Sequence, residues 1–277
     1  MSLDPGLYVA ATPIGNLKDV TYRVIEALAA CDLILCEDTR QTAKLCAAYD
    51  IRTERRPYHE HNAERVRPDI LSRLKKGARI CLVSDAGTPL ISDPGYKLVR
   101  EARDAGVRVA PLPGPCAAIA ALSAAGAPTD GFLFAGFAPT GNARATFFRR
   151  FAQVPASLIF YETGPRLGES LQDMANTFGD RTAVVARELT KIHEEFREGW
   201  LSDLAAYYKQ QTPKGEIVVV VHPPGREVPS AQEVEAFLSA ALDELSVKDA
   251  AVAAAEGFGL TRREAYERAL RLKAARS

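Results

Sequence analysis

Short apolar runs and amphipathic segments alternate along the first part of the chain. The runs typical of buried strands are 7–12, 32–38, 78–85 and 108–113. Between them, apolar residues recur with helical spacing near 21–30, 41–49, 62–76 and 94–105. Strands that alternate with helices in this way are typical of a parallel sheet covered by helices. We therefore predict an α/β domain over residues 1–114.

A second series follows an alanine-rich helical segment at 116–125. Its strand-like runs are 132–137, 157–162, 182–188 and 216–221, again with helical segments between them. We interpret residues 115–224 as a second α/β domain. The stretch 222–229 is rich in proline and glycine, which is typical of a linker.

Beyond this linker, three capping-box patterns each place an acidic residue three positions after a serine or threonine. They are Ser230/Glu233, Ser246/Asp249 and Thr261/Glu264. Because each pattern predicts the start of a helix, we expect residues 225–277 to form a small helical tail. Gly257 and Gly259 separate its last two helices with a spacing similar to that of a helix-turn-helix unit.

Composition narrows the class of protein without identifying a partner. The 277 residues are 47% hydrophobic, and 35 basic side chains balance 35 acidic ones, so no net charge attracts nucleic acid or membranes. The first residues lack a signal-peptide pattern, and the longest weakly polar run, 116–128, is too short to span a bilayer. We therefore expect a cytoplasmic protein with no membrane partner. Five cysteines without a Cys-x-x-Cys pair favour reduced thiols over disulfides.

Several familiar sites are missing from the sequence. No Gly-x-Gly-x-x-Gly follows the first strand and no Gly-x4-Gly-Lys-Ser/Thr occurs, which argues against dinucleotide and P-loop sites. No Gly-x-Ser-x-Gly elbow indicates a serine hydrolase. His59 and His61 are two positions apart with no third ligand evident, so we predict no metal site.

The segment 84–95, Ser-Asp-Ala-Gly-Thr-Pro-Leu-Ile-Ser-Asp-Pro-Gly, is the strongest indication of a binding site. It follows the apolar run 78–83, and its small residues leave backbone N–H and C=O groups accessible to a ligand. Asp93 as cap and Pro94 as first helical residue would then start a helix. The segment is longer than the roughly 2 to 6 residues of an ordinary strand-to-helix connection, which favours binding over a plain turn.

Polar clusters follow the other predicted strands of this domain, at 12–19, 37–40 and 59–62. Because the carboxyl ends of parallel strands meet at one edge of a sheet, these loops and 84–95 should line a single cleft. Taken singly, each of these residues is more simply interpreted as a helix cap or as part of a surface ion pair. Asp19 and Asn62 in particular suit the caps of the following helices. Together, the clusters predict a polar substrate site.

The last predicted helix is basic, with six basic and two acidic side chains over 261–276. Such a helix, with Arg262 and Arg263 in its first turn, is suited to hold nucleic-acid phosphates. The alternative is that this helix packs against the rest of the protein and that its basic face is simply exposed to solvent.

Taken together, the motifs resemble the tetrapyrrole methylase superfamily of S-adenosylmethionine-dependent methyltransferases. Within it they are most similar to the enzymes that methylate the 2′-hydroxyl of a cytidine in 16S ribosomal RNA. The segments that carry the resemblance are 12–19, 36–40, 59–62, 84–95, 112–122, 134–139, 161–166, 186–195 and 214–221. The whole set in this order is specific to the family, whereas any one segment alone would be weak evidence for the resemblance.

The resemblance implies two α/β domains, a homodimer, and S-adenosylmethionine bound between the domains largely by backbone groups. The positions that match the family's donor site are Pro13, Ala86, Gly87, Thr88, Ile91, Cys116, Ala117, Glu162, Leu189 and Gly215. Many relatives have serine where this chain has Cys116, so a hydroxyl contact found in the family is in doubt here.

The resemblance also implies an RNA substrate, the 16S ribosomal RNA at the decoding centre of the small ribosomal subunit. The positions expected to contact it are Lys18, Arg40, Asn62, Arg144, Arg149, Arg262 and Arg263. Relatives often have basic residues directly after the Phe-x-Pro of the second domain, where this chain has Thr140 and Gly141. We therefore expect that phosphate contact to have moved to Arg144, Arg149 or Arg150.

A ribose 2′-hydroxyl is a poor nucleophile while it is protonated, whereas a methyl group on a sulfonium is already activated. Alignment of the two groups should therefore dominate the rate, with help from a base within hydrogen-bond reach of the hydroxyl. The candidates for this base are Asp38, His61 and Glu37.

Two other functions stay open on the sequence. A small-molecule methyltransferase of the same superfamily would need neither the tail nor RNA. A noncatalytic nucleotide-binding protein would bind the donor without turnover, and the intact motifs at 84–95 and 112–122 argue against it.

Overall fold

The computed structural model describes residues 3–91, 95–225, 231–258 and 260–276. The chain divides into two compact units, Met1–Pro224 and Gly225–Ser277. The predicted helix starts at Asp93, Pro94 and Ser230 lie outside the described residues.

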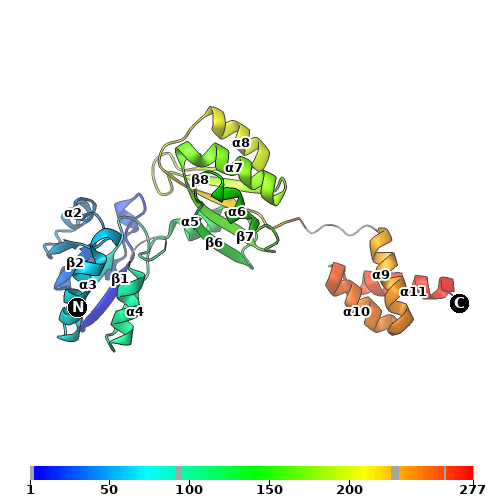
Figure 1. Ribbon diagram of the computed structural model, residues 1–277, viewed down its shortest axis with the longest axis horizontal. Helices are drawn as coiled ribbons and strands as arrows, with labels where there is room; N and C mark the ends of the chain where they lie inside the picture. The colour runs from blue at the N-terminus through cyan, green and yellow to red at the C-terminus, as the bar shows by residue number, and fades with distance from the viewer. Residues whose placement is uncertain (1–2, 92–94, 226–230, 259, 277) are drawn as a thin grey trace. The chain divides into compact units, whose positions relative to one another are not determined.

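The first unit begins with a five-stranded parallel sheet (Figure 1). Its strands are β1 (Gly6–Ala10), β2 (Leu33–Cys36), β3 (Arg55–Pro57), β4 (Arg79–Val83) and β5 (Val109–Leu112), in the order β3-β2-β4-β1-β5. The helices between them are α1 (Tyr22–Ala30), α2 (Thr39–Ala48), α3 (Glu60–Lys75) and α4 (Tyr96–Asp104). Because β1 and β4 are neighbours, the loops that follow them emerge side by side at the carboxyl edge.

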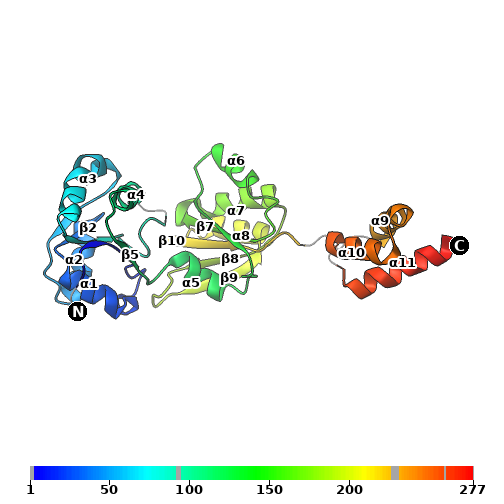
Figure 2. The same cartoon turned by 90° about the horizontal axis from the view of Figure 1, so that it is seen from below.

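Helices cover both faces of this sheet (Figure 2). Cys81 and Val83 of β4 pack with α1 and α2, whereas Leu82 packs with α3 and α4. A strand buried on both faces needs consecutive apolar residues, which explains the unbroken runs seen in the sequence.

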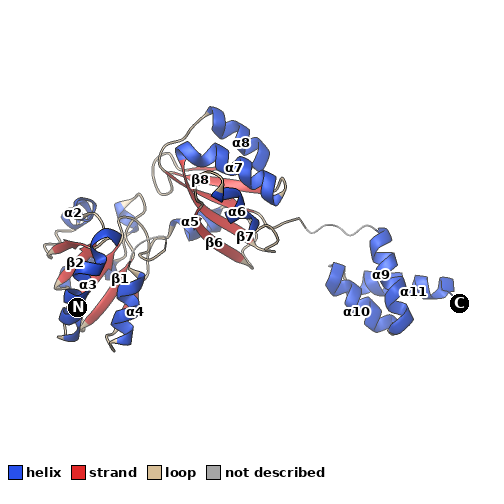
Figure 3. Ribbon diagram, in the orientation of Figure 1, coloured by secondary structure: helices blue, strands red, loops and turns tan. Residues whose placement is uncertain are grey.

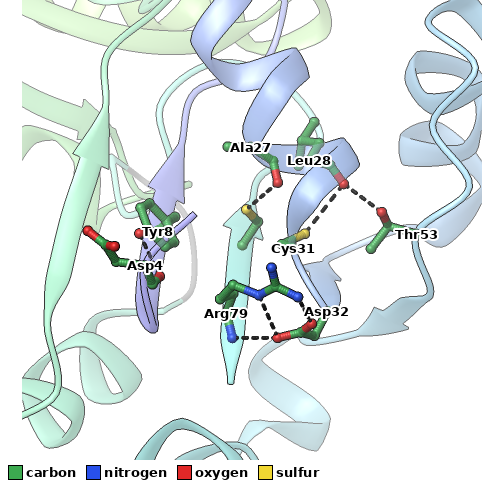
Figure 4. A network of polar contacts seen from close by, with 9 residues as sticks. Asp4, Tyr8, Ala27, Leu28, Cys31, Asp32, Thr53 and Arg79 are labelled. Atoms are coloured by element: carbon green, nitrogen blue, oxygen red, sulfur yellow. Dashed lines mark hydrogen bonds and ion pairs between the residues drawn. The ribbon is translucent and has the colours of Figure 1, made fainter. Parts of the chain in front are cut away.

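The amino-terminal edge of the first sheet is fixed by polar contacts (Figure 4). Arg79 donates its backbone N–H to the Asp32 carboxylate at 2.8 Å, and its guanidinium forms an ion pair with the same group. These hydrogen bonds hold the pKa of Asp32 below its ordinary value. Nearby, the Cys31 thiol and the Thr53 hydroxyl both donate to the Leu28 carbonyl, at 3.4 and 2.6 Å. This edge is therefore closed by structural contacts, while the carboxyl edge carries the loops.

Of the two expected helix caps in this domain, that of Asp19 was wrong and that of Asn62 is confirmed. Asp19 lies within a short 3-10 helix, η1 (Leu17–Asp19), and Thr21 caps α1 instead by accepting the Val24 N–H at 3.3 Å. Asn62 caps α3 from inside the helix, as the third residue of a capping box, where it accepts the backbone N–H of the cap residue His59 at 3.0 Å. Asn62 also donates to the Pro57 carbonyl at 2.9 Å, so its amide stabilises the first turn of α3.

The second sheet of the same unit is mixed. Its strands are β6 (Phe132–Phe137), β7 (Ser157–Thr163), β8 (Thr182–Arg187), β9 (Glu195–Trp200) and β10 (Glu216–Val221). Their order is β6-β7-β10-β8-β9, and β10 pairs antiparallel with both β7 and β8. The last strand of the unit is therefore the central strand of its sheet.

Four helices accompany the second sheet: α5 (Ala117–Ala124), α6 (Ala143–Arg149), α7 (Gly164–Phe178) and α8 (Leu201–Gln210). On one face, α6, α7 and α8 bury a core that includes Phe148 and Phe160, whose rings lie 5.3 Å apart. On the other face, small residues of α5 pack against Ile159, Val184 and Val218. The sheet thus has a thick side of three helices and a thin side where α5 leaves room beside the strands.

The second unit is helical (Figure 3), with α9 (Ala231–Glu244), α10 (Val247–Phe258) and α11 (Arg262–Arg276). Alanines of α10 and α11 pack against Val234 and Leu238 of α9. Thr261 and Glu264 form the predicted capping box, because the Glu264 N–H donates to the Thr261 hydroxyl at 3.2 Å and the Thr261 N–H to the Glu264 carboxylate at 3.1 Å. The predicted fold class, two α/β domains and a helical tail, is confirmed. Within the described part of the chain, no helix has the length and apolar character to cross a membrane.

Candidate functional site

The loops that follow β1 and β4 are joined to each other by backbone hydrogen bonds. Thr12 donates its N–H to the Gly87 carbonyl at 2.8 Å and accepts the Gly87 N–H at 3.0 Å. The Thr12 hydroxyl donates to Ser84 O at 3.1 Å, and the Ser84 hydroxyl donates to Gly87 O at 3.0 Å. Gly87 has φ +81°, in the left-handed region that favours glycine. The two loops therefore form one rigid platform at the carboxyl edge of the first sheet.

The same loop after β1 touches the second domain at Gly15. A Cβ added there would lie 2.8 Å from the Leu189 carbonyl oxygen and 2.8 Å from the Thr190 hydroxyl. Glu188 and Thr190 both have positive φ, 51° and 66°, which side chains adopt at a cost. The turn is held by the Lys191 ammonium, which donates to the Glu188 carboxylate at 2.9 Å. A strained turn of the second domain thus meets a glycine of the first.

A cavity of about 530 Å3 lies where these loops meet the second sheet. Small-molecule sites usually enclose roughly 300 to 1,000 Å3, so the cavity is large enough for a nucleoside-sized ligand. Its described lining residues are Ile14, Glu37, Asp85, Ala86, Gly87, Thr88, Ile91, Cys116, Ala117, Phe137, Tyr161, Glu188, Leu189, Lys191, Gly215, Glu216, Ile217 and Val218.

Two aromatic rings form part of the wall, Phe137 of β6 and Tyr161 of β7, with ring centroids 5.4 Å apart. The Tyr161 hydroxyl accepts the N–H of Ala118 at 3.2 Å, which ties the ring to the first turn of α5. Arg166 forms an ion pair with the buried Glu162 at 3.1 Å and donates to the carbonyls of Ala138 and Pro139. The backbone directly after Phe137 is therefore held in place from within the second domain.

The charged side chains of the described lining are mostly acidic: Glu37, Asp85, Glu188 and Glu216 against Lys191. Such a lining favours a ligand that carries positive charge. Glu37 is exposed, but the protein atoms around its carboxyl partly desolvate it, which raises its pKa above the ordinary value, and the neighbouring Asp85 carboxylate adds to the rise. Glu37 therefore takes up a proton more readily than a free glutamate does.

Comparison with known proteins identifies the family. Residues 6–205 match the family "Tetrapyrrole (Corrin/Porphyrin) Methylases", and residues 228–273 match the "RsmI C-terminal HTH domain". The chain is 47% identical to the ribosomal RNA small subunit methyltransferase I of Mesorhizobium japonicum, across 98% of this chain and 93% of that protein. It is 45% identical to the protein of the same name from Escherichia coli O157:H7, across 95% and 94%. The chain belongs to the ribosomal RNA small subunit methyltransferase I family of tetrapyrrole methylases.

Solved structures support the fold of this methylase family. A cobalt precorrin-4 methyltransferase superposes with a TM-score of 0.60 at 17% identity, covering 78% of this chain and 94% of that one. A diphthine synthase gives a TM-score of 0.62 at 15% identity, covering 78% and 89%. At this identity the likeness establishes the shared fold.

Eight of the ten positions that match the methylase donor site lie in the wall of the large cavity. They are Ala86, Gly87, Thr88, Ile91, Cys116, Ala117, Leu189 and Gly215. Pro13 instead lines a smaller cavity next to it. Glu162 is fully buried in the second sheet, where it pairs with Arg166 and accepts the Thr163 N–H at 2.9 Å. The donor-binding role of all ten stays a prediction.

The three candidate bases lie in different surroundings. Glu37 lines the cavity. Asp38 caps α2 and is held by the Arg40 side chain, which lowers the pKa of its carboxyl to about 2. His61 is exposed on α3, outside the described lining, with its ring 5.9 Å from that of His59. A carboxyl with a pKa near 2 is a weak base, so the surroundings favour Glu37.

The expected RNA contacts are dispersed over both units. Lys18, Arg40 and Arg149 are exposed, as are Arg262 and Arg263 on α11, where Arg263 pairs with Glu267 at 3.0 Å. By contrast, Arg144 is 5% exposed and pairs with Asp173 and Glu169. A buried, doubly paired guanidinium is a poor phosphate ligand, so Arg149 is the better candidate in that segment.

Sequence reasoning did not single out several lining residues. Those with distinctive chemistry are Asp85, Phe137, Tyr161, Glu188, Lys191 and Glu216. All six lie inside the motifs of the family resemblance, so the motifs themselves were the available signal. Among the residues that the structure describes, no group of acidic, histidine and cysteine side chains could hold a metal ion.

Replacing Gly15 by alanine should weaken donor binding by about tenfold or more, because the added methyl group forces the loop away from the turn at Leu189. Calorimetric titration with S-adenosylmethionine measures the change in Kd. Gly131→Ala is the matched control, since its Cβ would meet only Ala156 at 3.7 Å. Unchanged affinity in Gly15→Ala would mean that this contact does not shape the cavity.

Proposed function

We propose that the chain transfers a methyl group from S-adenosylmethionine to the ribose 2′-hydroxyl of a cytidine in 16S ribosomal RNA, at the decoding centre. The observation that carries the proposal is the large cavity in which a platform of backbone groups and a carboxyl of raised pKa, Glu37, lie together. Relatives at 45 to 47% identity over nearly their full length are named for the small-subunit ribosomal RNA.

The cavity fits the proposed donor in size and in charge. Its acidic side chains suit a ligand that carries a sulfonium and an ammonium group, and its small residues leave backbone groups accessible for an adenosine. We assign donor binding to the platform at Ala86, Gly87 and Thr88, to the start of α5, and to the segment that begins at Gly215. The donor supplies an already activated methyl group.

The remaining task for the protein is to orient the acceptor and to remove its proton. Glu37, as the carboxylate, accepts the proton of the 2′-hydroxyl as the ribose oxygen bonds to the methyl carbon; the carbon–sulfur bond of the donor breaks, and S-adenosylhomocysteine leaves. The loops around the cavity exclude water and hold the ribose in line. Exposed Lys18 and Arg40 near the same edge bind the RNA phosphates, and the basic helix α11 adds a further RNA contact.

The test is transfer of labelled methyl from S-adenosylmethionine to purified small ribosomal subunits that lack the modification. The RNA is then digested and the labelled nucleoside identified. Label in 2′-O-methylcytidine supports the proposal. Donor binding without label would favour a small-molecule methyltransferase, and donor binding without turnover on any acceptor would favour a noncatalytic protein. A cytoplasmic location stays a prediction from the sequence, and a homodimer stays a prediction from the family resemblance.

A further inference from the structure

An exposed tyrosine lies at the edge of the large cavity. Tyr96 is the first residue of α4 and is 63% exposed. Gly95, directly before it, packs against the loop after β4, because a Cβ added there would lie 3.5 Å from a side-chain carbon of Leu90. The next residue of that loop, Ile91, lines the cavity. Tyr96 therefore lies beside the cavity, outside its described lining.

The Tyr96 ring is held by its own helix. Arg100, one turn later in α4, donates to the Tyr96 hydroxyl at 3.3 Å. The Arg100 guanidinium also lies 3.9 Å from the Asp104 carboxylate, and its side chain is 67% exposed. A ring whose orientation is restricted before binding loses less entropy when a ligand packs on it. Tyr96 and Arg100 thus offer an aromatic ring and a guanidinium group to the same ligand.

The start of α3 continues this surface toward Glu37. α3 and α4 lie side by side on one face of the first sheet (Figure 2), and the Lys97 ammonium of α4 pairs with the Glu64 carboxylate of α3 at 3.2 Å. Tyr58, just before α3, donates its N–H to the Cys36 carbonyl at 2.7 Å, so this helix begins beside the strand end that Glu37 follows. The surface therefore adjoins both the proposed base and the cavity wall.

An exposed aromatic ring beside basic side chains is suited to bind unpaired RNA. A base packs its flat face on the ring, and guanidinium groups contact the base or the nearby phosphates. The exposed guanidinium groups of this surface include those of Arg65 on α3 and Arg100 on α4. Because Lys97 and Arg100, the exposed residues that follow the ring on α4, are charged, the surface lacks the apolar patch that a protein partner would cover.

We propose that Tyr96 stacks on a base next to the target cytidine and so holds the ribose of that cytidine over the cavity, an inference that rests on the proposed function. The 2′-hydroxyl reaches the donor only where the surrounding strand is unpaired, so neighbouring bases are free to stack on the protein. A neighbouring base held outside the cavity leaves the cavity itself to the donor and the target ribose. Since every base has a flat face, Tyr96 contributes affinity and position but no base selectivity.

The first test uses a short fluorescein-labelled single-stranded oligoribonucleotide with a central cytidine, and measures its binding to the full-length protein loaded with S-adenosylhomocysteine by fluorescence anisotropy. Tyr96→Ala should weaken binding by about fivefold or more, whereas Tyr96→Phe, which keeps the ring, should bind as wild type does. An oligoribonucleotide that lacks the base on one side of the cytidine should bind wild type more weakly by a similar factor, with no further loss in Tyr96→Ala.

Phe132→Ala is the matched control for the loss of an exposed aromatic ring. Phe132 is 46% exposed and begins β6, whereas the cavity residue Phe137 lies at the other end of that strand. This variant should bind the oligoribonucleotide as wild type does.

Methyl transfer to small subunits, measured with the same variants, separates the two proposals. Tyr96→Ala should raise KM for small subunits by about fivefold or more, Tyr96→Phe should restore it, and the Kd for S-adenosylmethionine should stay unchanged in both. If transfer occurs and Tyr96→Ala keeps wild-type KM and oligoribonucleotide affinity, the stacking contact is overturned and the proposed function stands. If no transfer occurs but the oligoribonucleotide results hold, the stacking contact stands and the proposed function fails.

Three further outcomes would overturn the stacking contact. Binding by Tyr96→Phe as weak as that by Tyr96→Ala would assign the effect to the hydroxyl group. Equal affinity of wild type for the complete and the base-deficient oligoribonucleotides would show that no neighbouring base is bound. A raised KM in Tyr96→Ala with unchanged oligoribonucleotide affinity would assign the contact to a protein of the small subunit.

Discussion

Glu37→Gln should lower kcat for methyl transfer by about 10²- to 10⁴-fold, the usual effect of removing a general base. Glutamine keeps the size of the side chain but cannot take up the proton of the 2′-hydroxyl. The rate is measured with donor and small subunits both saturating, so that altered binding does not contribute. If this variant keeps the wild-type kcat, Glu37 is not the general base.

The pH dependence gives a second readout of the same residue. Partial desolvation and Asp85 raise the pKa of Glu37 above its ordinary 4.5, and only the carboxylate form accepts a proton. The wild-type rate should therefore fall as the pH drops through this raised pKa, and Glu37→Gln should lack that fall. Asp38→Asn is the matched control: asparagine also caps a helix, and the Asp38 carboxyl, with a pKa of about 2, is not expected to supply the base.

Gly164→Ala should destabilise the first unit by about 3 kcal/mol, at the upper end of the usual cost of overpacking. Gly164 is buried at the start of α7, and an added Cβ would overlap the carbonyl oxygen of Pro213, a backbone atom that no side-chain rotation can move aside. For a unit of this size the loss corresponds to a fall in Tm of roughly 6 to 12 °C.

The same substitution should also change the shape of the donor cavity. The Gly164 N–H donates to the Gly215 carbonyl at 3.3 Å, and Gly215 lines the cavity wall. Displacement of Pro213 therefore moves this wall, and the Kd for S-adenosylmethionine should rise in the fraction that still folds. Thermal melting and calorimetric titration are compared with Gly131→Ala, whose added methyl group meets only ordinary contacts. A melting temperature equal to that of the control would contradict the steric argument.

Sequence patterns predicted the strands that are rich in apolar residues and missed the two charged edge strands, β3 and β9. After their first, charged residue, β4 and β10 are unbroken apolar runs because both of their faces are covered. The edge strand β3 has only three residues, two of them arginines, and the edge strand β9 carries Glu195 and Arg197, which form an ion pair. Exposed edges tolerate charge, so hydrophobic pattern gives no signal there.

The site was predictable in part for a related reason. Small residues at 84–95 mark a loop by their own chemistry, so Gly87 and Thr88 could be named in advance. Tyr161 looks like an ordinary strand residue, and its place in the wall depends on the antiparallel position of β10 beside β7, which no local pattern specifies. Asn62 was predicted as the residue at which its helix starts, whereas it is the third residue of the helix. A capping box and a simple cap use the same residue types, so the sequence does not distinguish the two positions.

Because β10 lies at the centre of its sheet, its position determines when a growing chain can first bind the donor. Until β10 leaves the ribosome, β7 and β8 have no partner between them, and the synthesised part of the second sheet consists of two separate pairs, β6 with β7 and β8 with β9. The donor cavity lacks its Gly215 to Val218 wall for the same interval. We therefore expect nascent chains that end before residue 216 to bind no donor, so that methylation competence arises late in synthesis and all at once.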